Sequence, residues 1–440
     1  MGFVQTVKNI WKIEDLRMRL LITIGFIAIY RFGSFVVLPG VDPVALDALQ
    51  TNASSGLLSL LDMFSGGAFS NASIFALGIM PYISASIVMQ LLGIAIPAFQ
   101  KLQREGESGR TKMNQYTRYL TVAILLFQGP AYIYGALGAA IPGGLFDWVI
   151  PSTIILAGGS MFVLWLGERI TDKGIGNGIS FIILVGIIAR LPHSLVAEVD
   201  RLLDAPGGLV LFLLEIVFLM IVIAGAIMLV QGTRRIPVQY AKRVVGNRQY
   251  GGVRQYIPLK VNAANVMPII FAQAIMFIPL TAARFSASEG GGFWASLMDY
   301  TSIWYNLIFA LIIIAFTYFY TAITVNPIQM AEDLKRNNGF IPGIKPGKRT
   351  AEYIDTVMSR ITLPGSLFLA LVAIMPAFAG LMGINSQFAN FFGGTSLLIL
   401  VGVVLDTLQQ IESHLLMRHY DGFLKSGAKI KGRTGAMAAY

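Results

Sequence analysis

Few residues of this 440-residue chain could do chemistry, and their spacing does not assemble a catalytic site. The chain contains no cysteine, which excludes thiol catalysis, disulfides and cysteine-ligated metals. Its three histidines, His193, His414 and His419, lack the spacing of a metal-binding pair, so a zinc enzyme is not expected. The sequence has no Walker motif and no catalytic constellation, and we therefore expect neither an enzyme nor a resident cofactor.

A glycine-rich run is the one segment that superficially resembles a phosphate-binding loop. It reads Gly174-Ile175-Gly176-Asn177-Gly178. A phosphate-binding loop would follow a strand and would continue into a Lys-Ser or Lys-Thr pair, and both features are missing. The run is therefore predicted to be a tight cytosolic turn at the start of a helix.

The elements that must position any functional residue are membrane helices. Hydrophobic residues make up 55% of the chain, charged residues 13%, and the mean hydropathy is +0.68. A soluble protein carries about 25% charged residues. A spanning helix needs about 20 mostly apolar residues. Ten stretches meet this requirement: 20–38, 73–95, 119–138, 149–167, 178–194, 208–231, 263–283, 305–326, 364–383 and 393–411.

The basic residues are sorted to one side of these spans. The net charge is +10, and 29 of the 33 Lys and Arg residues fall in the first segment, every second loop and the tail. The positive-inside rule therefore places both termini, 1–19 and 412–440, in the cytosol. The apolar run after residue 19 is too long for a signal peptide, so we expect a cytosolic amphipathic segment there.

Ionisable residues inside the spans are rare. They are Arg31, Glu215 and Asp406. Arg31 and Asp406 lie where a side chain could reach the membrane interface, whereas Glu215 could pair with a neighbouring helix. A secondary transporter, the main alternative for ten spans, needs a polar site near the midplane, which the sequence does not offer. A scaffold or membrane-bound enzyme has the least support.

Two basic loops are longer than is needed to set the orientation of the spans in the membrane. Loop 232–262 has seven basic residues, no acid and three interleaved tyrosines, and loop 327–363 has six basic residues. These loops could be topology signals that bind anionic lipid headgroups. Loop 168–177 has only two basic residues, which suffice to orient its helices in the membrane. The larger number of basic residues in the two long loops therefore favours a docking surface for a large acidic partner such as ribosomal RNA.

Segment 54–71 does not fit a simple bundle. Its apolar part, 56–64, would span about 14 Å as a helix, which is too short to cross a bilayer of about 30 Å. It ends at Ser65-Gly66-Gly67, a flexible break. Physical arguments leave two possibilities equally open: a surface helix on the outer leaflet, or a half-helix folded back into the bundle.

Isoleucine pairs four residues apart lie in the middle of two spans. They are Ile79 with Ile83, and Ile179 with Ile183. Each pair shares one helix face. Isoleucine in a membrane helix usually faces lipid or a neighbouring helix, so periodicity alone does not assign these pairs a special role.

Six long segments resemble the bacterial SecY family in their order and spacing, and the resemblance covers about residues 15–425. They are FSGGAFSNASIFALGIMPYISASIVMQLL (64–92), EGESGR with QYTRY (105–119), WLGERITDKGIGNGIS (165–180), RRIPVQYAKR (234–243), GFIPGIKPGKRTAEYID (339–355) and FGGTSLLI (392–399).

This resemblance implies an all-α membrane protein of ten transmembrane helices, arranged as two pseudo-symmetric, inverted five-helix halves around a central hourglass pore. The N-terminal half would be 20–190, the external hinge 191–207 and the C-terminal half 208–411. A short plug half-helix at about 55–68 would seat on the pore. The implied function is a passive channel for unfolded secretory polypeptides, which releases signal sequences and transmembrane helices sideways into lipid through a lateral gate.

The resemblance also assigns site residues. The pore ring would comprise Ile79, Ile83, Ile179, Ile183, Ile270 and Val404, the last in place of the usual isoleucine. The plug would include Leu57, Leu58, Leu60, Leu61, Met63, Phe64, Ser65, Gly66 and Gly67. The lateral gate would use Gln90 and Asn265. Docking would use Arg234, Arg235, Lys242, Arg243 and Lys345, the last where the family motif PGIRPG has arginine. No metal or cofactor is implied.

The partners implied by the resemblance are the SecE and SecG subunits, the SecA motor or the ribosome, and signal sequences with nascent chains. Membrane lipid and the proteins YidC and SecDF are further partners that the resemblance implies. The location would be the bacterial cytoplasmic membrane.

Overall fold

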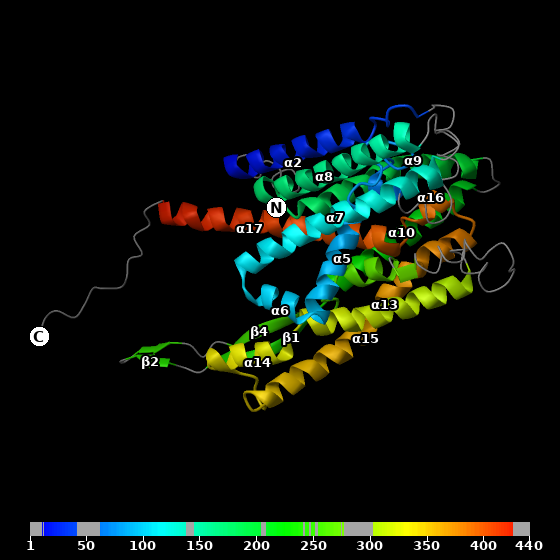
Figure 1. Cartoon of the computed structure of the whole chain (residues 1–440). Coiled ribbons are helices and arrows are strands. Elements are labelled where there is room, and N and C mark those ends of the chain that lie inside the picture. The colour runs from blue at the N-terminus through cyan, green and yellow to red at the C-terminus, as the bar shows by residue number, and fades with distance from the viewer. Residues whose placement is uncertain are drawn as a thin grey trace, which may run out of the picture.

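In a computed structural model of the chain, the structure describes residues 11, 13–41, 62–137, 145–203, 208–240, 243–245, 248–250, 254–273, 275–276 and 302–425. Long helices that run side by side dominate the fold (Figure 1). This confirms the predicted fold class of a helical membrane protein.

Long helices occupy nine of the ten predicted spans within the described residues. They are α2 (Glu14–Gly33), α5 (Met80–Ala95), α7 (Glu107–Ala136), α8 (Ile150–Lys173), α9 (Gly178–Leu203), α10 (Gly208–Gln231), α13 (Ile303–Thr324), α15 (Lys348–Leu381) and α17 (Gly394–Lys425). The span 263–283 is helical over 267–273 and 275–276, and residues 277–283 lie outside the described part.

Six helices of the described residues are long and apolar enough to cross a membrane by themselves. Helix α5 and the short α6 (Pro97–Arg104) are bent by 103° to one another and together would make a seventh. Helix α2 is not among the six. Three arginines, at positions 17, 19 and 31, interrupt its apolar stretch.

Most predicted spans differ in their bounds from the helices, and two of these differences bear on the plug and on the expected hinge. Helix α5 begins at Met80, because residues 73–79 form turns that include Gly78 at φ 51°. Helix α9 continues past residue 194 to Leu203 and contains Pro192, so most of the expected hinge 191–207 is helical and residues 204–207 lie outside the described part. Pro192 lacks the N–H that would pair with the carbonyl of Ile188, and membrane helices tolerate such a proline in their interior.

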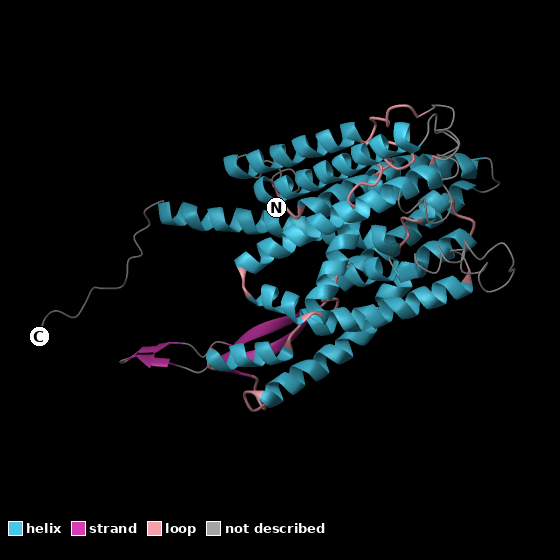
Figure 2. Ribbon diagram, in the orientation of Figure 1, coloured by secondary structure: helices cyan, strands magenta, loops and turns pink. Residues whose placement is uncertain are grey.

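A small sheet, which the sequence analysis did not predict, lies at one end of the helices (Figure 2). Strand β1 (Thr233–Tyr240) pairs antiparallel with β4 (Arg254–Lys260) and with β5 (Gly339–Phe340). Strands β2 (Arg243–Val245) and β3 (Arg248–Tyr250) form a separate hairpin. The two long basic loops are therefore one structural unit, joined through the β1–β5 pair.

Helix α14 (Pro327–Arg336) and the start of α15 cover this sheet. Ile236 and Val238 of β1 share an apolar cluster with Leu334 of α14 and Ile354 of α15. The alternation of buried and exposed residues along β1 follows from the two-residue period of a strand, so its other face is left to solvent.

The remaining short elements connect the long helices. A π-helical turn, Leu145–Val149, leads into α8, and α16 (Ser386–Ala389) lies between α15 and α17. The glycine-rich run is the predicted turn at a helix start, since Asn177 Oδ1 accepts from Ile179 N at 3.1 Å at the beginning of α9. Helices α10, α13, α15 and α17 share the largest apolar cluster.

Candidate functional site

The described part of the predicted plug folds back into the helix bundle. Every residue from 62 to 70 is buried except Phe64, which is half-buried. Residues 62–65 form a helical turn, and 66–70 form non-helical turns, and we call residues 62–70 the plug turn. Burial on this scale favours the folded-back segment over a surface helix. The plug residues Leu57, Leu58, Leu60 and Leu61 lie outside the described residues.

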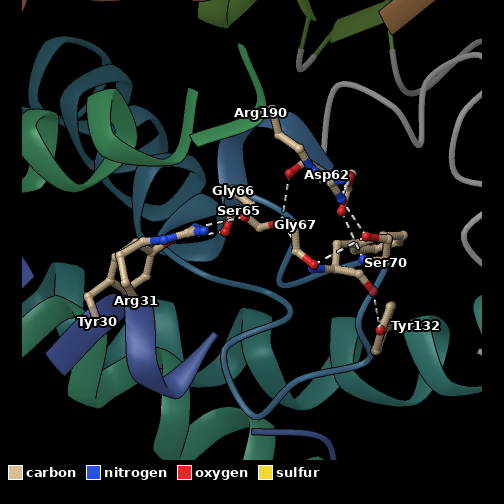
Figure 3. A network of polar contacts seen from close by, with 10 residues as sticks. Tyr30, Arg31, Asp62, Ser65, Gly66, Gly67, Ser70, Tyr132 and Arg190 are labelled. Atoms are coloured by element: carbon tan, nitrogen blue, oxygen red, sulfur yellow. Dashed lines mark hydrogen bonds and ion pairs between the residues drawn. The ribbon is translucent and has the colours of Figure 1, made fainter. Parts of the chain in front are cut away.

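Polar side chains from two helices hold the main chain of the plug turn (Figure 3). From α2, Tyr30 Oη donates to Ser65 O at 3.0 Å and Arg31 Nη1 donates to Gly66 O at 2.8 Å. From α7, Tyr132 Oη donates to Phe69 O at 2.8 Å. Ser65 O and Phe69 O also accept from the main chain, from Ala68 N at 3.4 Å and Ala72 N at 3.2 Å, so the tyrosines add a second bond to these buried carbonyl groups.

Helix α9 supplies the charged partner of the plug turn. Arg190 Nη2 forms an ion pair with Asp62 Oδ2 and donates to Ser70 Oγ. The other carboxylate oxygen, Asp62 Oδ1, accepts from Ser70 N at 2.8 Å. Arg31 therefore contacts the turn through a main-chain carbonyl, whereas Arg190 contacts it through side chains.

Glycines allow α9 and the plug turn to touch backbone to backbone. A Cβ on Gly186 would lie 2.8 Å from Phe64 O, and a Cβ on Gly66 would lie 2.7 Å from the Cα of Gly186. Gly66 and Gly67 have φ of +65° and +92°, conformations that side chains disfavour. The Ser-Gly-Gly break is thus required by a sharp turn and a close approach.

Four of the six predicted ring residues gather around the plug turn. Ile183 is buried in one apolar cluster with Met63, and Ile79 is buried in a second with Ala68 of the plug turn. Ile83 and Ile179 pack against both clusters. The four isoleucines therefore share apolar clusters with residues of the plug turn; Ile179 and Ile183 come from α9, Ile83 from α5, and Ile79 directly precedes α5.

The other two predicted ring residues lie elsewhere within the described part. Ile270 is half-buried and Val404, on α17, is 38% exposed. Neither belongs to the three apolar clusters that contain plug-turn residues. Their place in a ring remains a prediction.

The predicted gate residues each make a local hydrogen bond. Gln90 Nε2 lies 3.5 Å from Ser86 Oγ, one turn earlier on α5. Asn265 has φ 51°, and its carbonyl accepts from Asn262 Nδ2 at 3.1 Å. The gate assignment also remains a prediction.

The predicted docking residues lie on the sheet and its neighbouring turn. Arg234 and Arg235 are exposed on β1, and Lys345 is exposed in the turn before α15. Arg243 begins β2, and Lys242 lies outside the described residues. The sheet brings the two basic loops to the same end of the molecule as the end of α17 (Figure 1).

A second charged cluster, which the sequence analysis did not identify, joins α9 to α10. Arg201 pairs with Glu198, which is fully buried, and its Nη2 lies 3.8 Å from Glu215 Oε1. Glu198 Oε2 also accepts from Asn385 N at 2.9 Å, in the segment between α15 and α16. The prediction that Glu215 pairs with a neighbouring helix is confirmed.

The sequence carried only a weak signal for these charged groups. Asp62, Arg190 and Arg201 stand out as charges away from the basic loops, but nothing in their spacing pairs them. Among the described residues, no group of three or more His, Asp or Glu side chains could hold a metal ion.

Comparisons with known proteins agree on one family. The SecY family profile matches residues 73–408. The protein translocase subunit SecY of Streptomyces scabiei is 44% identical and covers 94% of this chain and 98% of its own length. Its counterpart in Mycobacterium tuberculosis strain H37Rv is 42% identical over 96% of this chain and 99% of its own.

Solved structures share the fold. One described as the structure of a protein conducting channel superposes with a TM-score of 0.61 at 18% identity, over 94% of this chain and 95% of its own. Sec61 in a canine ribosome-channel complex superposes with a TM-score of 0.56 at 17% identity, with the same coverage. At such identities the likeness concerns the fold alone.

Proposed function

The chain belongs to the SecY family of protein translocase subunits, and we propose that it forms the passive pore through which unfolded secretory polypeptides cross the cytoplasmic membrane of a bacterium. It is a multi-pass membrane protein. The proposed orientation has both termini and the basic sheet in the cytosol, because 29 of 33 basic residues fall on that side.

The observation that supports this proposal most strongly is the seating of the plug turn on the four isoleucines. A constriction of apolar side chains sheds water and blocks ions, yet it can fit around an extended chain without recognising one sequence. Met63 lies in the same apolar cluster as Ile183, and this packing supports a closed channel in which the plug turn would cover the constriction.

The remaining parts of the proposal concern the route and the driving force. Signal sequences and membrane helices would leave toward lipid between α5 and the helix that begins at residue 267, near Gln90 and Asn265. A signal sequence that binds the open gate more tightly than the closed one would shift the equilibrium toward the open state. The energy would come from the SecA motor or from the elongating ribosome.

The basic sheet would be the docking site for these partners. Arg235 lies on the face of β1 opposite Ile236 and Val238, which pack on α14 and α15, and Arg234 is exposed near the start of the same strand, so both charges sit on a rigid support. A structural relative, Sec61, is described in complex with a ribosome. SecE and SecG would complete the channel complex, with YidC and SecDF as further partners.

A reconstituted transport assay tests the proposed function. The purified chain, with SecE and SecG, is placed in proteoliposomes with SecA and ATP, and protection of a signal-bearing precursor from protease is measured. We expect protection that depends on the chain. In planar bilayers, Ile183→Asn should raise resting ion conductance, because a polar group wets the constriction.

The matched control is Ile188→Asn on the same helix, since Ile188 is 44% exposed on the surface of the described bundle. It should leave conductance at the wild-type level. Absence of precursor protection would refute the transport function. Equal conductance in the two variants would refute the role of Ile183 in the constriction.

A further inference from the structure

One arginine on α9 and one aspartate at the start of the plug turn form an ion pair inside the bundle (Figure 3). We propose that Arg190 is a positioning residue that holds the plug turn in its seat through Asp62 and Ser70, and that this contact sets how often the resting channel is closed. The inference rests on the proposed pore function and names the side chains that would keep the pore closed.

The contact fixes both ends of the plug turn with a single guanidinium group. Arg190 Nη2 reaches Asp62 Oδ2 and, at 2.5 Å, Ser70 Oγ. Asp62 Oδ1 accepts from Ser70 N at 2.8 Å. Because Asp62 and Ser70 are eight residues apart and bonded to each other, the arginine binds the turn as a closed loop. Movement of the turn away from α9 must break both bonds of Arg190 together, whereas the bond between Asp62 and Ser70 moves with the turn.

The environment of the pair makes it sensitive to mutation. The Asp62 side chain is 11% exposed and the Arg190 side chain 27%. Ion pairs that are largely removed from water are weakly screened by salt, and a buried carboxylate that loses its partner is strongly unfavourable. Without Arg190, the Asp62 carboxylate would gain water by leaving the seat, so the displaced position of the turn would be favoured.

The other side chains that bond the turn do not depend on a side chain of the turn. Tyr30, Arg31 and Tyr132 all donate to main-chain carbonyl groups. Any residue type at those turn positions would offer the same acceptor. The Arg190–Asp62 pair joins two side chains, and it can therefore be removed, weakened or reversed by substitution while the main-chain bonds remain.

A second arginine provides a matched control within the described residues. Arg118 on α7 pairs with Glu168 on α8 at 2.6 Å, with side chains 47% and 32% exposed. Both hydrogen bonds of this pair join α7 to α8 rather than to the plug turn. Arg118→Ala therefore removes an interhelical ion pair without touching the proposed seat.

The experiment measures resting ion conductance of the channel complex with SecE and SecG in planar bilayers. Arg190→Ala should raise conductance roughly tenfold, the effect of losing a charged hydrogen bond to a buried group. Asp62→Asn should raise it less, because the amide oxygen still accepts from Ser70 N. Arg118→Ala should match the wild type. The exchanged pair, Arg190→Asp with Asp62→Arg, should return conductance toward the wild-type value.

A thiol probe reports the position of the turn directly. The chain has no native cysteine, so Met63→Cys, at a position 5% exposed, is a unique label site. A membrane-impermeant maleimide should label it slowly in the wild-type background and faster with Arg190→Ala. Arg190→Lys keeps the charge and should give intermediate labelling, and it serves if Arg190→Ala fails to assemble.

Wild-type conductance and labelling in the Arg190 and Asp62 variants would overturn the proposal, as would fully additive effects in the exchanged pair. Failure of the pore function itself is a different result, because precursor protection would then be absent from the wild-type complex. Active transport together with unaffected Arg190 variants would remove the inference and leave the pore intact.

Discussion

Gly186 lies where α9 touches the plug turn, and Gly186→Ala tests whether this close approach seals the channel. The added methyl group would sit 2.8 Å from Phe64 O and 3.2 Å from Gly66 N. The first distance is shorter than real contacts allow, and both neighbours are main-chain atoms that cannot rotate away. Either the plug turn or α9 must therefore move.

The magnitude follows from the cost of inserting a methyl group into a packed interior, about 1–3 kcal/mol. In the displaced position of the turn this clash is absent, so nearly all of the cost falls on the closed state. A change of this size shifts a two-state equilibrium by about 5–150-fold toward the open channel.

The assay is resting ion conductance in planar bilayers, with Gly158→Ala as the matched control. Gly158 lies inside α8, and a Cβ there would meet nothing within 4 Å. Both substitutions bring the same gain in helix propensity. We expect increased conductance for Gly186→Ala and wild-type conductance for Gly158→Ala. Equal conductance in the two variants would falsify the argument that backbone contact with α9 seats the plug.

Two further predictions concern the sheet and the charged cluster. Reversing the charge at Arg234, Arg235, Lys242 and Arg243 should reduce cosedimentation with ribosomes in a salt-dependent manner, since each lost phosphate contact removes counterion release; cosedimentation unchanged at every salt concentration would contradict docking there. Arg201→Met should lower the free energy of unfolding of the detergent-solubilised complex by about 1–3 kcal/mol in thermal denaturation, because the buried carboxylates of Glu198 and Glu215 lose their cation. Adding Glu215→Gln should recover part of the loss, and no recovery would contradict this pairing.

Much of the fold could be predicted from the sequence because membrane spans are local. A run of about 20 apolar residues specifies a spanning helix without reference to the rest of the chain. Residues 208–231 illustrate this, since the predicted span and α10 have the same bounds. The start of α5 was not predictable in this way, because apolar residues 73–79 read as helix but form turns around Gly78.

The sheet could not be predicted from the sequence, because its strands carry weak local signals and pair with distant segments. Strand β5 has two residues, and β1 alternates buried and exposed positions over a short stretch rich in arginine. Such a pattern is weak in a single sequence. Strands β1 and β5 pair across just over a hundred residues of chain, from Gln239 to Phe340, so the partner of each strand lies beyond any local sequence window.

The sequence by itself determined the composition, the spans, the sorting of charge and the resemblance to one family. It also supplied the isoleucine pairs and the Ser-Gly-Gly break. Only the tertiary structure decided that the break folds back onto four of those isoleucines, and that Asp62 meets Arg190, 128 residues away. The physical reason is that hydropathy fixes each helix separately, whereas an ion pair between helices depends on how the helices pack against each other.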